Sequence, residues 1–292
     1  MRRSPRDLDA QLRAFLREDL GEHGDVTSLA MVLVERRANA MVRARGPGVL
    51  AGVAVARRLV ALGAPGVRCR VLARDGARFR RGAPVLSLSG PLRGMLRVER
   101  TLLNLLGRMS GVATATRAMV DAAAGTPARI RDTRKTTPGL RALEKAAVIC
   151  GGGVSHRAGL FDAFLAKDNH LAGVPLERIA SVVQRAVARA RRLAPLAFTM
   201  VEVDTEAQFV ALLALPRGVV DAVLLDNMSP ARMRRIVALR NRTVPWLKLE
   251  ASGGVTTASV PAIARSGVDF ISAGSITHSA PQVDFGLDIV EA

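Results

Sequence analysis

The residue types best suited to chemistry gather between Arg131 and His170 of this 292-residue chain. This stretch also holds a Thr-Thr-Pro-Gly turn at 136–139 and a run of three glycines at 151–153. Its basic side chains are Arg131, Arg134, Lys135, Arg141, Lys145, His156, Arg157 and Lys167. Fixed positive charge beside glycine backbone, which a ligand can approach closely, predicts a pocket for a small, multiply charged anion.

The distribution of lysine supports a pocket over a solvated basic face. Only four of the 43 Lys and Arg residues are lysine, and three of them lie in this stretch, at Lys135, Lys145 and Lys167. Lysine is a compact point charge that suits single phosphate oxygens, whereas arginine binds carboxylates through two parallel hydrogen bonds. A basic run of ordinary composition is usually a solvated face. Here the glycines, the histidine and the flanking apolar runs favour a binding site.

Composition is that of a globular protein with room for one large domain or two modest ones. Hydrophobic residues make up 49% of the chain and charged residues 23%. Cys69 and Cys150 offer neither a disulfide framework nor metal-ligand spacing, which fits a reducing compartment. Charged residues interrupt the first 20 positions, so no signal peptide is expected, and no apolar run has membrane-spanning length. We therefore expect a cytoplasmic protein.

The formal net charge of +18 raises the alternative of a basic nucleic-acid-binding protein. Against it, the arginines are scattered and not grouped in tails or on one helix. Aromatic residues make up only 3% of the chain and tyrosine is absent, so bases would find few stacking platforms. A basic surface could still attract anionic substrates or bind nucleic acid weakly and without specificity.

The elements that position these residues form two different patterns. The first part of the chain predicts an antiparallel sheet with helices on one side, and Asp25 or Thr27 could cap a helix. Its expected elements are helices at 6–20, 52–62 and 95–124, the last interrupted near Ser110-Gly111, and strands within 38–50 and 67–90. After Thr126-Pro127, short apolar runs alternate with helical stretches, which indicates βα units and a parallel sheet. No G-x-G-x-x-G follows the first run, so a βα barrel is favoured over a Rossmann sheet.

The apolar runs of the second part close on residues that carry chemistry. These are Lys167, Glu202, Asp226, Glu250 and Gly274, and the carboxyl ends of barrel strands converge on one rim where active sites lie. A single charged strand end could simply reach solvent, but several in register predict a shared site.

Two glycine turns and two carboxylates suggest what this rim would bind. The turns at 252–255 and 273–275 each follow a strand and open a helix, so their N–H groups predict a phosphate grip. Glu202 and Asp226 could hold Mg²⁺ with the help of substrate phosphates, or could bind ribose hydroxyls instead. No Ser-His-Asp or Cys-His arrangement indicates a covalent nucleophile.

The histidines of this region differ in what surrounds them. His156 follows the glycine run and precedes an arginine, so we expect it to contact a ligand. His170 and His278 are interpreted as structural. Asp168 and Asn169 are expected to orient Lys167 and its loop.

Motifs along nearly the whole chain resemble, in order and spacing, those of the quinolinate phosphoribosyltransferase family. They are EDLGEHGDVTS, VERTLLNLLGRMSGVAT, RDTRKTTPGLRALEK, GGGVSHRAGL, KDNH, VEVD, LLDNMSP, LEASGG and SAGSITHSAP. The resemblance implies an N-terminal α/β sandwich domain (1–110, joined by 280–292) and a C-terminal, incomplete seven-stranded βα barrel (111–279). The last strand, about 283–290, would return to the first domain, and the protein would form a homodimer or hexamer.

The resemblance also implies an activity and roles for individual residues. The enzymes transfer a phosphoribosyl group from phosphoribosyl pyrophosphate to quinolinate with loss of CO₂, giving nicotinate mononucleotide. Arg134, His156, Arg157 and Lys167 would hold the quinolinate carboxylates, with Arg100 reaching in from a neighbouring subunit. Thr133, Lys135, Lys167, Ser252, Gly253, Gly254, Ala273, Gly274 and Ser275 would bind the remaining substrate groups, chiefly phosphates. Glu202 and Asp226 would hold Mg²⁺ and ribose hydroxyls, and with Lys135 and Lys167 they form the expected catalytic set.

Three positions depart from the family pattern. Ser155 replaces an Asn before the His-Arg pair and could loosen the loop that carries His156, whereas Ala146 and Met200 replace residues that look peripheral. A related phosphoribosyltransferase of the same fold, using nicotinate or another pyridine carboxylate, is the alternative enzyme. Nicotinate lacks the second carboxylate, so a site for it would not need so many cationic side chains.

Overall fold

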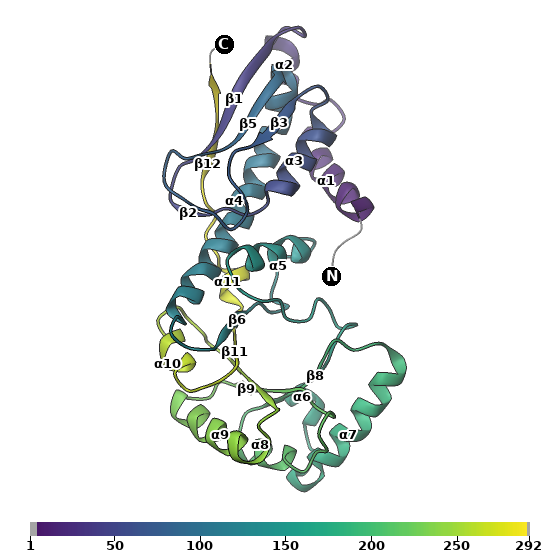
Figure 1. Ribbon diagram of the computed structural model, residues 1–292. Coiled ribbons are helices and arrows are strands. Elements are labelled where there is room, and N and C mark those ends of the chain that lie inside the picture. The colour runs from purple at the N-terminus through teal and green to yellow at the C-terminus, as the bar shows by residue number, and fades with distance from the viewer. Residues whose placement is uncertain (1–4, 291–292) are drawn as a thin grey trace. The chain divides into compact units, whose positions relative to one another are not determined.

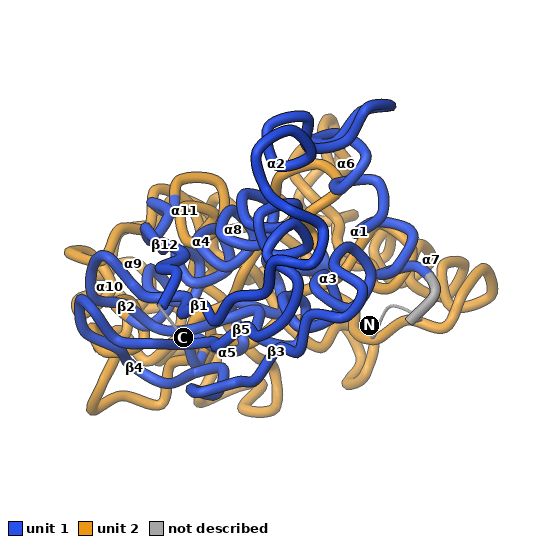
Figure 2. Tube along the Cα trace, turned by 90° about the horizontal axis from the view of Figure 1, so that it is seen from above, with its two compact units in different colours: residues 1–117, 142–152, 280–292 blue, residues 118–141, 153–279 orange. Residues whose placement is uncertain are grey.

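The computed structural model describes residues 5–290 and divides the chain into two compact units (Figure 1; Figure 2). Unit 1 comprises Met1–Arg117, Ala142–Gly152 and Ala280–Ala292, and unit 2 comprises Ala118–Arg141 and Gly153–Ser279. The predicted second domain, 111–279, therefore includes two segments, 111–117 and 142–152, that group with unit 1.

Unit 1 is built on an antiparallel sheet in the order β12-β1-β5-β3, with a separate two-stranded pair of β2 and β4. Its strands are β1 (Arg37–Ala44), β2 (Gly48–Val49), β3 (Arg68–Val71), β4 (Arg78–Phe79), β5 (Pro84–Pro91) and β12 (Phe285–Val290). Its helices are α1 (Pro5–Leu20), α2 (Val26–Met31) and α3 (Val53–Gly63), while α4 (Leu92–Ala122) and α5 (Arg141–Cys150) each extend past a boundary between the units. Asp25 caps α2 by accepting a hydrogen bond from the Ser28 N–H. Of the two expected caps, Asp25 and Thr27, the structure thus uses Asp25.

The last strand of the chain completes this sheet. β12 pairs with β1 in antiparallel register, from Ala44 opposite Phe285 to Asn39 opposite Val290. Ala40, Val42 and Ala44 alternate toward the buried face of β1, as period-two patterning requires. The expected return of the chain end to the first domain is confirmed.

Helix α4 is continuous, so the predicted interruption near Ser110-Gly111 is wrong. A Cβ on Gly111 would lie 2.1 Å from the carbonyl oxygen of Pro281, and one on Gly107 would lie 2.6 Å from that of Val283. These glycines let the segment before β12 approach the helix closely. They serve packing, which the local sequence pattern does not distinguish from helix breaking.

Unit 2 is built on a parallel sheet in the order β6-β11-β10-β9-β8-β7. Its strands are β6 (Arg129–Arg131), β7 (Phe164–Ala166), β8 (Thr199–Val203), β9 (Ala222–Asp226), β10 (Lys248–Ser252) and β11 (Phe270–Ser272). Its helices are α6 (Asp168–Leu171), α7 (Leu176–Leu193), α8 (Glu206–Leu212), α9 (Pro230–Thr243), α10 (Val260–Ala264) and α11 (Ser275–His278). The alternation of strand and helix confirms the predicted βα architecture.

The seventh strand of the expected barrel is present as a single bridge. Val154 pairs with Arg131 in parallel, on the free side of β6. Within residues 5–290 no strand pairing joins this edge to β7, so the barrel is incomplete, as expected. The sheet's carboxyl-end edge is the rim on which the strand ends converge.

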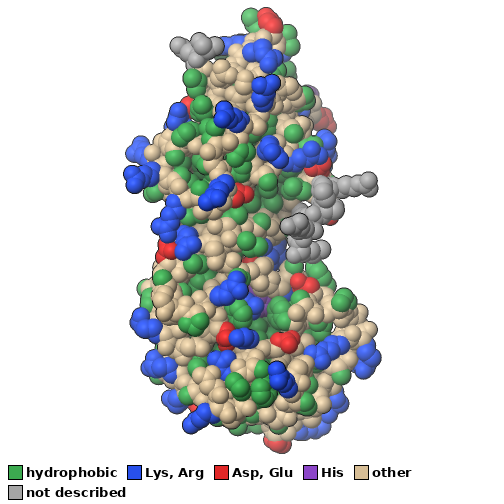
Figure 3. Space-filling model, viewed as in Figure 1, with side chains coloured by type: hydrophobic (Ala, Val, Ile, Leu, Met, Phe, Trp, Pro, Cys, Tyr) green, Lys and Arg blue, Asp and Glu red, His purple; other side chains and the backbone are tan. Residues whose placement is uncertain are grey.

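Lysine and arginine side chains are spread over the molecular face in Figure 3 and do not gather in one place. This agrees with the scatter of arginines along the sequence. Among the described helices, none combines the length and apolarity needed to cross a membrane.

Candidate active site

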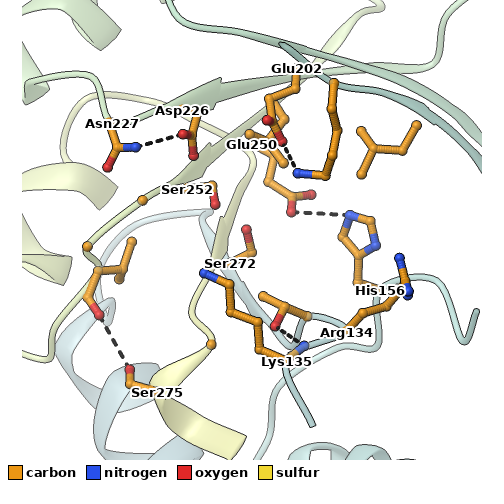
Figure 4. A pocket seen from close by; sticks show the side chains of 18 of the residues that line it. Arg134, Lys135, His156, Glu202, Asp226, Asn227, Glu250, Ser252, Ser272 and Ser275 are labelled. Carbon is orange, nitrogen blue, oxygen red and sulfur yellow. Dashed lines mark hydrogen bonds and ion pairs between the residues drawn. The ribbon is translucent and has the colours of Figure 1, made fainter. Parts of the chain in front are cut away.

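A cavity of about 740 Å³ opens in unit 2 and collects most of the residues expected at the site (Figure 4). The expected residues that line it are Thr133, Arg134, Lys135, His156, Arg157, Lys167, Glu202, Asp226, Ser252, Gly253, Gly254, Gly274 and Ser275. Ala273 is buried beside the cavity, where its N–H donates to the Arg131 carbonyl. Arg100 lies on α4 in unit 1 and is exposed, so its role across a subunit boundary stays a prediction.

The strand ends meet at the rim as the sequence predicted. Glu202 lies within β8, Asp226 and Ser252 end β9 and β10, and Lys167 directly follows β7. Parallel register places Asp226 opposite Ser252. One cavity therefore receives side chains from four neighbouring strands.

Lys167 and Glu202 form an ion pair inside the cavity. Lys167 Nζ lies 2.5 Å from Glu202 Oε2, and the Glu202 side chain is only 8% exposed. An anionic ligand at this ammonium would share it with Glu202. The backbone of Lys167 is held by His170, whose Nδ1 accepts from the Lys167 N–H at 3.1 Å. This contact supports the interpretation of His170 as structural. Asp168 and Asn169 were expected to orient Lys167, but this contact to the Lys167 backbone comes from His170.

Arg134 and Arg157 bring two guanidinium groups to the lining of the cavity. Arg157 is only 7% exposed. Its burial and the nearby charge of Arg134 lower the pKa of Arg157, against smaller opposing effects from Asp162 and Glu202. Arg134 Nε is buried and has no hydrogen-bond partner within the described residues. Two guanidinium groups so placed favour the binding of an anion.

His156 is fixed from several directions at once. Its backbone N–H donates to Asp132 Oδ1 at 2.8 Å, and its ring meets Phe198 edge-on at 5.1 Å. The ring Nδ1 accepts from the Arg157 N–H at 2.7 Å, which assigns the proton of the neutral ring to Nε2. Nε2 lies 3.4 Å from Glu250 Oε1.

Glu250 is the lining residue that sequence reasoning noticed as a strand end but left out of the site. It is fully buried, and its Oε2 accepts from Arg131 Nη1 at 2.7 Å. Burial raises the pKa of Glu250, although the charge of Arg131 opposes this. Arg131 also stacks on Phe270, with 3.5 Å from Cζ to the ring centroid. Arg131 is therefore a partner of Glu250 and not part of the cavity lining.

Two other cations of the 131–170 stretch, Arg141 and Lys145, do not line the cavity. Arg141 donates from Nε to Thr136 Oγ1 at 3.0 Å and from Nη1 to the Ala158 carbonyl at 3.3 Å. Lys145 is buried on α5, in the part of that helix that belongs to unit 1. Only part of the basic cluster thus faces the cavity.

Ser155 makes a contact that anchors the loop carrying His156. Ser155 Oγ donates to Asp132 Oδ2 at 3.2 Å, while Asp132 Oδ1 accepts from the His156 N–H. Asp132 is fully buried, so one carboxylate anchors both residues to the end of β6. Ala146 and Met200 do not line the cavity, and Met200 packs in a core cluster with Ala222 and Leu224.

The two glycine turns differ in how they are built. Gly253 and Gly254 have φ values of +90° and +58°, which favour glycine. Helix α10 begins only at Val260, so the expectation that this turn directly opens a helix is wrong, and its N–H groups act without a helix behind them. Gly274 directly precedes α11, and a Cβ there would lie 3.0 Å from Lys135 Cδ. Ser275 Oγ donates to the Val255 carbonyl at 3.4 Å and links the two turns (Figure 4).

The cavity also contains lining residues that were not among the predicted site residues. They are Leu165, Leu224, Asn227, Glu250, Val255, Thr256, Ser272 and His278. Of these, Asn227 carried a usable signal, because an asparagine directly after a strand end is suited to a left-handed turn. His278 was interpreted as structural, but it lines the cavity, and its Nδ1 lies 2.6 Å from Ser279 Oγ.

The donor set for a metal consists of two carboxylates. No group of three or more His, Cys, Asp or Glu side chains within residues 5–290 is arranged to hold a metal ion. Glu202 and Asp226 both line the cavity, and Mg²⁺ can be held by one or two carboxylates when substrate phosphates supply further oxygens. Burial and the charges of Asp226 and Asp168 raise the pKa of Asp204, and the charge of Lys167 opposes this. The residues present thus fit Mg²⁺ in company with a phosphorylated substrate.

Comparisons with known proteins agree with this geometry. The chain matches the quinolinate phosphoribosyl transferase N-terminal domain over residues 25–110 and the C-terminal domain over 112–288. It is 43% identical to nicotinate-nucleotide pyrophosphorylase (carboxylating) of Mycobacterium leprae, with 95% of each chain covered. It is 37% identical to the probable enzyme of that name from Bacillus subtilis, covering 97% of this chain and 93% of the relative. The structure of nicotinate-nucleotide pyrophosphorylase from Francisella tularensis matches with a TM-score of 0.87 and 31% identity, over 99% and 98% of the two chains. The chain belongs to the quinolinate phosphoribosyltransferase family.

Proposed function

We propose that this protein transfers the phosphoribosyl group of phosphoribosyl pyrophosphate to quinolinate and releases pyrophosphate and CO₂. The product would be nicotinate mononucleotide, a precursor of NAD. The observation that carries this proposal is the like-charged pair of Arg134 and Arg157 beside His156 and Lys167 in one cavity. A pyridine with two adjacent carboxylates supplies the negative charge that this group of cations lacks.

The chain's own residues act by orientation and charge. Arg134, Arg157 and His156 would hold the two carboxylates, leaving the pyridine nitrogen directed at C1 of the ribose. The nitrogen displaces pyrophosphate at that carbon, and positive charge develops on the ribose in the transition state. The adduct then loses its 2-carboxylate as CO₂, and the electron pair left on C2 takes up a proton. No covalent intermediate with the protein is needed.

The other side of the cavity suits the sugar and its phosphates. Lys135, Lys167 and the glycine turns offer cationic and N–H donors to phosphate oxygens. Glu202 and Asp226 would hold Mg²⁺ or the ribose hydroxyls, and a bound ion would neutralise charge on the leaving pyrophosphate. Chelation should therefore abolish turnover and added Mg²⁺ should restore it.

The experiment that tests the proposal follows pyrophosphate and ¹⁴CO₂ release with carboxyl-labelled quinolinate. Turnover with quinolinate and none with nicotinate is the expected result. Arg134→Ala should lose most activity, whereas Arg192→Ala, a matched change on the exposed face of α7, should not. Turnover with nicotinate alone would refute the substrate assignment. Equal effects of both substitutions, together with tight and salt-sensitive DNA or RNA binding, would favour the basic nucleic-acid-binding alternative.

We also propose a homodimer or larger assembly in which Arg100 of one copy completes the site of another. Its support is the family pattern and the exposure of Arg100 on α4. Mixing inactive Arg100→Ala and Lys167→Ala variants should restore some activity, and no recovery in verified mixed dimers would refute the sharing. A cytoplasmic location is proposed as well, because Cys69 and Cys150 are both free thiols, and cell fractionation tests it.

A further inference from the structure

Asn227 has an unusual backbone conformation at the mouth of the cavity. Among the described residues it is the one residue other than glycine with a positive φ, at 52°. It directly follows β9 and lines the cavity. Left-handed conformations are disfavoured for most side chains, and Asn, Asp and Gly tolerate them best.

The side chain of Asn227 is committed to its neighbour. Its Nδ2 donates to Asp226 Oδ2 at 2.7 Å, and the two side chains point toward one another in Figure 4. Its backbone N–H donates to the Ser252 carbonyl at 3.0 Å, across to the end of β10. The residue therefore joins two strand ends that both supply cavity groups.

The amide also packs against the glycine turn. A Cβ on Gly253 would lie 2.2 Å from Asn227 Oδ1 and 2.5 Å from its Cγ. The Asn227 amide therefore occupies the space that a side chain at position 253 would need. One end of the amide holds a carboxylate and the other abuts the turn proposed to bind phosphate.

We propose that Asn227 is a positioning residue, whose amide holds the Asp226 carboxylate facing the cavity and at a fixed distance from the glycine turn. The inference rests on the role proposed above for Asp226 in binding Mg²⁺ or ribose. Without the amide donor, Asp226 can rotate about its side-chain torsions, and repulsion between Asp226 and Asp204 would bias that rotation. The consequence is a carboxylate less well placed for the sugar phosphate.

The competing explanation is that Asn227 serves only as a turn residue. Two variants separate the explanations, because Asn227→Gly and Asn227→Asp both suit the left-handed backbone while both remove the amide donor. If only the turn matters, both variants should behave like the unsubstituted protein. If the donor matters, both should lose activity and keep their melting temperature.

The expected loss in kcat/KM for phosphoribosyl pyrophosphate is about tenfold for Asn227→Gly, which corresponds to about 1.4 kcal/mol. Asn227→Asp should lose more, because the introduced carboxylate replaces a donor to Asp226 by a like charge beside it.

Steady-state assays of both variants, with kcat and KM for phosphoribosyl pyrophosphate determined separately, and thermal melts test the proposal. Asn241→Asp, the same change on the exposed part of α9, is the matched control and should have no effect. Wild-type kcat and KM for both Asn227 variants would overturn the inference while leaving the proposed function intact. Full activity of Asp226→Asn would also overturn the inference, because it would show that the carboxylate held by Asn227 is not needed. Absence of turnover by the unsubstituted protein would refute the proposed function, and the inference with it.

Discussion

Replacing Arg157 by methionine should affect stability and substrate use in opposite directions. The Arg157 side chain is buried, and its burial and the Arg134 charge lower its pKa in the folded protein. When folding lowers the pKa of a cationic group, the charged form of that group is less stable in the folded protein than in the unfolded chain. Over the accessible pH range, charged Arg157 therefore reduces the free energy of unfolding. Methionine keeps an unbranched stem of similar length but carries no charge.

The magnitudes follow from burial and from the partners of Arg157. Attraction to Asp162 and Glu202 offsets part of the cost of burying the guanidinium, so the expected gain is modest. A gain of about 1 kcal/mol should raise the melting temperature by about 2–4 °C. Removing one cation from a buried charge pair costs about 2–5 kcal/mol of binding, so kcat/KM for quinolinate should fall by roughly 30-fold to several-thousand-fold.

Thermal melts and steady-state kinetics on the same preparations measure both effects. Quinolinate should raise the melting temperature of the unsubstituted protein and leave that of Arg157→Met unchanged. Arg192→Met, on the exposed face of α7, controls for the loss of one positive charge. A melting temperature lowered by several degrees would show that Arg157 stabilises the fold, contrary to the reasoning. Unchanged kcat/KM would show that it does not bind the substrate.

Three further substitutions test the site and its scaffold. Burial alone would raise the pKa of Asp269, but hydrogen bonds from Lys248 and the Leu249 N–H and the Arg240 charge hold it below 3.8. That stability is present above pH 3.8 and is lost as the pH falls through the lowered pKa, so Asp269→Asn should cost about 1.5–3 kcal/mol in urea unfolding at pH 7 and progressively less as the pH falls below 3.8. Gly253→Ala should lower kcat/KM for phosphoribosyl pyrophosphate at least about tenfold, because a methyl group meets the Asn227 amide and φ is +90°. Gly111→Ala should cost about 1–3 kcal/mol in urea unfolding and spare the cavity, since its Cβ would lie 2.1 Å from the Pro281 carbonyl oxygen.

The rim of the site was predictable because strand ends carry a strong local signal. Lys167, Glu202 and Asp226 each close an apolar run, and a parallel βα fold brings such ends to one edge. What the sequence could not supply was which charges pair with one another. Lys167 and Glu202 are 35 positions apart, and Arg131 and Glu250 are 119 apart. Their pairing depends on strand order, register and side-chain rotamers, which local patterns do not contain.

The errors of prediction have a common physical origin. Ser110-Gly111 resembled a helix break, but the tertiary contact with Pro281 explains the glycine and α4 continues through it. The turn at Gly253 and Gly254 resembled a helix start, but α10 begins only at Val260. In both cases a glycine was interpreted as a signal of local structure, although it is needed because another segment of the chain packs against it.

Departures from ordinary packing rules are concentrated at the cavity of unit 2. Asn227 adopts a left-handed conformation, Arg134 Nε is buried without a partner, and Arg157 lies near Arg134 despite the like charge. Elsewhere the described charges are better matched: Arg108 binds Glu144 within unit 1, and Arg240, whose Nε also lacks a partner, still binds Asp269. Each departure costs stability wherever it occurs, so selection for folding alone would not gather them at one place. Their coincidence at one cavity points to a ligand that supplies negative charge, independently of the likeness to relatives.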